Sequence, residues 1–140
     1  MAYLTPLVWR HKSQFLPLLA CRMVKYSLEY GFCKDSIHAF NALSLAFVYG
    51  CRDEIDTGIK WGNFSKSLMD FYGAKEFTPT VYLTLYAAVR IWKEPSQALQ
   101  PPLFEAYRVG LECGNIGACF PSCYFIYIIP QFHLNHILLF

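Results

Sequence analysis

The sequence has few charged residues and no cluster of them. Only 16% of its 140 residues carry charge, 55% are hydrophobic, and the formal net charge is +2. Lys and Arg are scattered along the chain, so no basic stripe predicts a nucleic-acid partner or an anionic membrane surface. Disorder is excluded as well, because aromatic residues reach 18%. Two classes of protein remain: a membrane protein, or a segment of a larger soluble protein whose apolar surfaces contact the rest of that protein.

A secretory signal is also missing from the sequence. Arg10, His11 and Lys12 interrupt the first twenty residues, so no apolar signal segment forms there. We therefore expect a cytoplasmic protein whose thiols stay reduced and are mostly buried as small apolar residues. The six thiols are Cys21, Cys33, Cys51, Cys113, Cys119 and Cys123.

No apolar run reaches the roughly 18 residues that a transmembrane helix needs. The best candidate, 116–129, is too short and contains Pro121 and Ser122, and polar residues after Pro130 interrupt its continuation. We predict a buried helix here and no membrane span. The alternative is a small membrane-associated protein anchored by the apolar segment 116–140.

Apolar residues recur three or four positions apart in four segments, 35–50, 53–72, 79–93 and 102–113, and strict two-residue alternation is absent. The segments predict helices. Thr78-Pro79 is a typical helix start, and Pro95 and Pro101-Pro102 predict breaks between the last two segments. The predicted core faces are, in chain order, Ile37, Phe40, Leu43 and Phe47; Trp61, Phe64, Leu68 and Phe71; Val81, Leu85, Ala88 and Trp92; Leu103, Tyr107 and Leu111. Ser65 is one of the positions predicted to be polar and outward-facing, and Asp53 and Glu54 are predicted in the first helical turn.

Three glycines reveal a period of about 40 residues. Gly31, Gly73 and Gly114 each follow an apolar helical segment, with separations of 42 and 41 residues. A left-handed C-terminal cap favours glycine at such positions. A period of this length is typical of stacked helix pairs, so we predict an all-α fold of five or six helices, arranged as antiparallel pairs in an α-solenoid of tetratricopeptide-like type. The repeat domain is placed at 1–129, followed by a divergent hydrophobic C-terminal tail at 130–140. The alternative is an ordinary irregular helical domain.

The chemical motifs of common enzymes are absent: no phosphate-binding loop, no zinc-protease helix and no calcium loop. The glycines at 58 and 62 are interpreted as a close helix contact, Glu54 and Asp56 as surface charge, and the aromatic stretch 124–127 as core. A zinc site remains an alternative hypothesis, with Cys119 and Cys123 four apart and Cys113, His133 and His136 around them. Two thiols one helical turn apart pack equally well, and none of the four histidines has the context of a Cys–His nucleophile. We predict no catalytic, cofactor or metal site, and no small-molecule substrate.

Three sequence segments resemble a known family. The helix ends at Met23–Gly31 and Ala106–Gly114 and the turn at Ala74–Phe77 are similar to the helical linker of very large signalling proteins. Those proteins join a kinase-like domain, a predicted AAA-type ATPase, this tetratricopeptide-like region, and a GAF sensor with a histidine kinase. The resemblance covers roughly 16–127, lapses after about residue 129, and implies a non-catalytic scaffold that contacts a protein partner or neighbouring domains. It also implies that the chain is a piece of a longer protein, whose kinase and ATPase motifs lie elsewhere.

Overall fold

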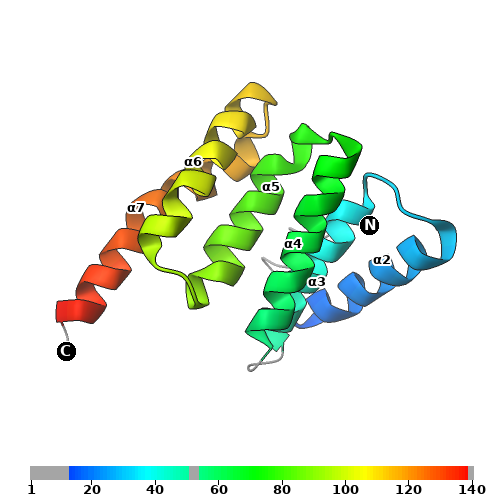
Figure 1. Cartoon of the computed structure of the whole chain (residues 1–140), viewed down its shortest axis with the longest axis horizontal. Helices are drawn as coiled ribbons and strands as arrows, with labels where there is room; N and C mark the ends of the chain where they lie inside the picture. The colour runs from blue at the N-terminus through cyan, green and yellow to red at the C-terminus, as the bar shows by residue number, and fades with distance from the viewer. Residues whose placement is uncertain (1–12, 51–53, 139–140) are drawn as a thin grey trace. The chain divides into compact units, whose positions relative to one another are not determined.

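The computed structural model describes residues 13–50 and 54–138, and the side chains of 13, 129 and 131–138 lie outside the description. This part of the chain is all-α. It contains the helices α2 (Leu16–Tyr30), α3 (Ser36–Gly50), α4 (Ile55–Tyr72), α5 (Thr78–Tyr82), α6 (Ser96–Glu112) and α7 (Ile116–Leu138) (Figure 1). A short 3-10 turn, η2 (Ser13–Phe15), precedes α2. Two more, η3 (Lys75–Phe77) and η5 (Arg90–Trp92), and one π-helical stretch, η4 (Leu83–Val89), lie between the later helices. The chain forms two compact units that divide after Ala74.

In the first unit, α3 packs between α2 and α4 as two antiparallel pairs (Figure 1). The contact between α3 and α4 is close because the residues on it are small. Ser44 Oγ donates a 2.6 Å hydrogen bond to the carbonyl oxygen of Gly58, and Ser65 Oγ donates a 2.9 Å hydrogen bond to that of Ile37. A Cβ atom on Gly58 would lie 2.6 Å from Val48 Cγ2 and 3.0 Å from the backbone carbonyl oxygen of Ser44. The expectation that this glycine serves a close helix approach agrees with these distances.

An aromatic cluster borders that contact. The Phe40 ring stacks on Trp61 at a centroid distance of 5.5 Å and meets Phe64 edge-on at 4.7 Å. Phe32, in the loop before α3, adds its ring 5.9 Å from Phe40. The Tyr72 hydroxyl donates a 2.9 Å hydrogen bond to the Phe32 carbonyl. Ring pairs of this geometry add stabilisation beyond the area that they bury, and here they join the α2–α3 loop to α4.

In the second unit, α6 and α7 form an antiparallel hairpin, and α5 with η4 packs against both of its helices (Figure 1). Gly110 lies at the centre of the packing. A Cβ atom there would lie 2.6 Å from Cys119 Sγ of α7 and 3.4 Å from Pro79 Cγ of α5. The Asn115 amide contacts Thr80 Oγ1 at 3.4 Å.

The segment 79–93 is not the single helix that the sequence predicts. Thr78 is itself the first helical residue rather than the cap, and the helix widens into the π-helical η4 before ending in η5. A wider turn brings Val89, rather than Ala88, beneath Leu85, and both Leu85 and Val89 are fully buried. Trp92 is consequently exposed, and its indole N–H donates to the Ala88 carbonyl at 3.2 Å.

The predicted break at Pro101-Pro102 is wrong. Helix α6 begins at Ser96 and contains both prolines. Each proline removes one backbone hydrogen bond, in the second turn of the helix. The helix gains more by continuing, because Leu99 and Leu103, on either side of the prolines, are both fully buried. Only Pro95, whose backbone is extended, marks a real helix start.

The predicted core faces need a correction that is the same in α4 and α6. Phe64 and Phe71 of α4 and Leu111 of α6 are predicted to face the core, but Phe71 is 81% exposed and Phe64 and Leu111 are also exposed. The buried residues on these helices are mostly smaller. Ser65, expected on the surface, is fully buried. Helices approach closely where side chains are short, so small residues occupy the contact and larger ones lie beside it.

The predicted start of the second helix also shifts. Helix α4 begins at Ile55, which leaves Glu54 at its N-cap, and Asp53 lies outside the described residues.

The three periodic glycines are the glycines with positive φ among the described residues: +93° at Gly31, +59° at Gly73 and +72° at Gly114. Two of them close a Schellman cap. Gly73 and Ala74 donate to the Asp70 and Met69 carbonyls, and Gly114 and Asn115 donate to the Leu111 and Gly110 carbonyls in the same pattern. Gly31 also ends its helix, but its ψ of 163° is extended rather than left-handed.

Replacing Gly73 by alanine should destabilise the protein by about 1 kcal/mol, because a Cβ atom disfavours the left-handed backbone. Space is not the cause, since nothing lies within 4 Å of the added atom. Urea unfolding measures the change. The matched control is Gly117→Ala, at a helical position with room for the methyl group; a loss of equal size in both variants would contradict the capping role.

Replacing Gly58 by alanine should also destabilise the protein, but through lack of space rather than through backbone conformation. Its backbone is helical, but the added Cβ would overlap Val48 and the Ser44 carbonyl. Overpacking of this kind costs about 1–3 kcal/mol. The double variant Gly58→Ala with Val48→Ala should recover part of the loss. If Gly58→Ala alone unfolds at the same urea concentration as the parent, the close contact between α3 and α4 is not required.

Candidate interaction surfaces

The cysteines and histidines considered for zinc do not gather into a ligand set in the part that the structure describes. Cys119 is buried and its Sγ lies 3.2 Å from the Asn115 carbonyl, while Cys113 is exposed and Cys123 is half-buried. The side chains of His133 and His136 lie outside the described residues. Burial, with a smaller contribution from Cys123, raises the pKa of the Cys119 thiol, which favours the protonated form and opposes metal ligation or nucleophilic attack.

The expectation of mostly buried thiols is wrong for three of the five described cysteines. Cys21, Cys33 and Cys113 are exposed, and all five are free thiols. Cys51 lies outside the described residues. Cys21 lies on the side of α2 that faces solvent, Cys33 lies in the loop between α2 and α3, and Cys113 caps the end of α6.

The alternative prediction of a membrane anchor falls on α7. This helix runs from Ile116 through both Pro121 and Pro130 to Leu138, across the boundary placed at 129. Among the helices of the described residues, none combines the length and the apolarity required to cross a bilayer.

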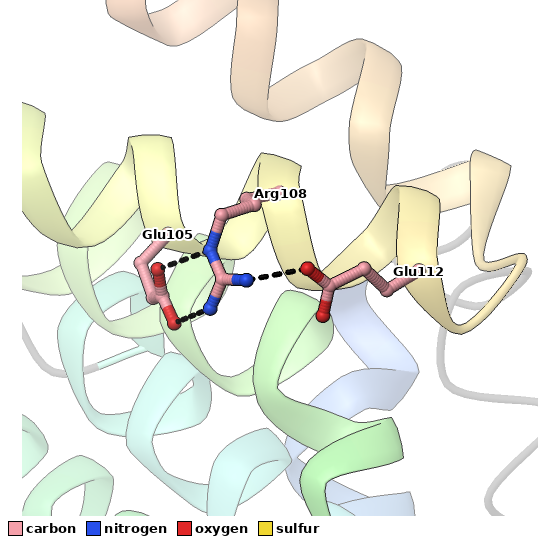
Figure 2. A network of polar contacts seen from close by, with 3 residues as sticks. All are labelled: Glu105, Arg108 and Glu112. Carbon is pink, nitrogen blue, oxygen red and sulfur yellow. Dashed lines mark hydrogen bonds and ion pairs between the residues drawn. The ribbon is translucent and has the colours of Figure 1, made fainter.

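The exposed side of α6 carries a three-residue ionic network (Figure 2). The Arg108 guanidinium binds Glu105 through two hydrogen bonds, Nε to Oε2 at 3.0 Å and Nη2 to Oε1 at 2.7 Å, and it binds Glu112 through Nη1. The hydrogen bond from Arg108 lowers the pKa of Glu105, and the paired carboxylates raise that of Arg108. All three groups are solvent-exposed, so the network contributes little stability. It leaves this face of α6 without a free cation.

Helix α7 carries a row of exposed apolar residues on the side that α6 does not cover. Phe120 is 75% exposed, Tyr124 61% and Tyr127 75%, and Ile116 precedes them at helical spacing. The expectation that the aromatic stretch 124–127 is core is therefore wrong at both tyrosines. We call Phe120, Tyr124 and Tyr127 the α7 stripe.

Exposed residues of α6 extend the α7 stripe. Leu111 and Phe120 each follow by one residue the contacting pair Gly110 and Cys119, which turns both side chains about 100° away from the helix–helix contact. Because the two helices run antiparallel, the two turns lead to the same side of the hairpin. Phe104, which is also exposed, lies seven residues, or about two helical turns, before Leu111. The hairpin thus packs one side on α5 and η4. Away from that side it exposes Phe104 and Leu111 of α6, with Arg108 of the ionic network between them in sequence, together with the α7 stripe.

The sequence contained a signal for this surface that its helical periodicity could not interpret. Residues at 116, 120, 124 and 127 do follow a helical stripe, and a stripe alone predicts burial rather than exposure. The segment 116–138 contains no Asp, Glu, Lys or Arg, so no polar face marks the outside. Only the packing partners of α7 decide which side stays open.

Comparison with known proteins found no match to this chain among family models, curated proteins or solved structures.

One histidine in the first unit gives stability a pH dependence. Burial lowers the pKa of His38 in the first turn of α3, against an opposing effect of Asp35. The folded state therefore holds His38 neutral at pH values where the unfolded chain already binds a proton. The contribution of His38 to the free energy of unfolding is fully present above about pH 6.5, and it decreases as the pH drops below that value.

Urea unfolding between pH 7.5 and 5.5 should show this loss, and His38→Gln should reduce its slope. The comparison of the two chains over the same range cancels the other histidines. A slope that is identical in both chains would show that His38 is not the group responsible.

Proposed function

We propose that this chain is a helical-repeat scaffold of α-solenoid type whose role is to bind a protein partner rather than to catalyse a reaction. The observation that carries the proposal is a burial pattern that repeats with the period of the glycines. It is found on the three helices that end at a positive-φ glycine, α2, α4 and α6.

The positions fifteen, eleven and eight residues before each glycine are buried in all three helices. The position four before is buried in α4 and α6, and half-buried Ser27 stands there in α2. The residues are Leu16, Ala20, Met23 and Ser27; Gly58, Gly62, Ser65 and Met69; Leu99, Leu103, Ala106 and Gly110. A helix that buries one stripe at fixed distance from its cap is the unit of a helical repeat.

The residues that differ between the repeats support the same interpretation. The stripe reads Leu-Ala-Met-Ser in α2 and Gly-Gly-Ser-Met in α4, so the repeat keeps the position and changes the side-chain volume. Successive units can then pack on one another although their sequences have diverged. The resemblance of the sequence to the linker region of large signalling proteins also suits such a scaffold, and it rests on the helix ends at Met23–Gly31 and Ala106–Gly114 and on the turn at Ala74–Phe77.

A scaffold role is supported by the surfaces that the helices present. Large apolar side chains are exposed on α2, α4, α6 and α7, among them Leu28, Phe71, Leu111 and Phe120. Exposed apolar residues in this density are typical of surfaces that another protein covers. The ionic network on α6 satisfies its own charges, so recognition would rely on shape and apolar contact rather than on electrostatic steering.

Deletion of one period tests the repeat architecture. Removing residues 32–73, so that Gly31 precedes Ala74, should leave a shorter chain with unchanged helicity per residue and a cooperative thermal transition, because each unit contacts only its neighbours. Far-UV circular dichroism measures both quantities.

The matched control removes the same number of residues out of register, 42–83, and should abolish the cooperative transition. An irregular domain has no reason to distinguish the two deletions. If both shortened chains lose their structure, the solenoid proposal is wrong.

A further inference from the structure

We draw no further inference here: the strongest candidate, the surface patch that the α7 stripe forms with Phe104 and Leu111 on the α6–α7 hairpin, is an unpartnered apolar face, and nothing in the structure shows what covers it.

Discussion

The close contact between neighbouring helices, made by short side chains, is the constraint on which the rest of the structure depends. At Gly58 and Gly110 there is no room for a Cβ atom. The hydroxyls of Ser44 and Ser65 donate hydrogen bonds across the α3–α4 contact to backbone carbonyls of the facing helix. In an α-helix such carbonyls ordinarily bond only within the helix. Helices that approach this closely leave no space for large residues between them. The aromatic side chains of α4 lie at the border of its contact with α3, where Trp61 and Phe64 pack against the buried Phe40, or remain exposed, as Phe71 does.

The same constraint connects the helix ends to the helix faces. A positive-φ glycine ends α4 and α6 in one defined geometry, so the residues at fixed distances before it point in one defined direction. This is why a period visible as three glycines is also a period of burial. On the other side of each glycine, the positions five and eight residues beyond it are buried in α3, in α5 and in α7. In α7 these positions are Cys119 and Ser122, while the residues of the α7 stripe remain exposed.

Helical periodicity predicted the class of fold, the helix-ending glycines and the close approach at Gly58 correctly. It failed on which residues face inward, because hydrophobic scales rank Phe71 and Leu111 above Gly62 and Ser65, whereas close packing selects by volume. It failed at Pro101-Pro102, because the cost of two missing hydrogen bonds is local and the burial of Leu99 and Leu103 is not. It also placed Tyr124 and Tyr127 in the core. A helix without charges offers no polar side from which its exposed face could be inferred.

The sequence by itself determined what depends on neighbours along the chain: helix formation, the glycine caps that need positive φ, and the spacing of about 41 residues between them. The absence of charge from 116–138 is equally a property of the sequence. Only the tertiary structure decided what depends on distant partners. It selected small residues for the helix contacts, widened the helix at 83–89 so that Val89 could follow Leu85 into the core, and left one side of α7 open. The physical reason is that burial belongs to a pair of surfaces, and a sequence read along one helix contains only one of them.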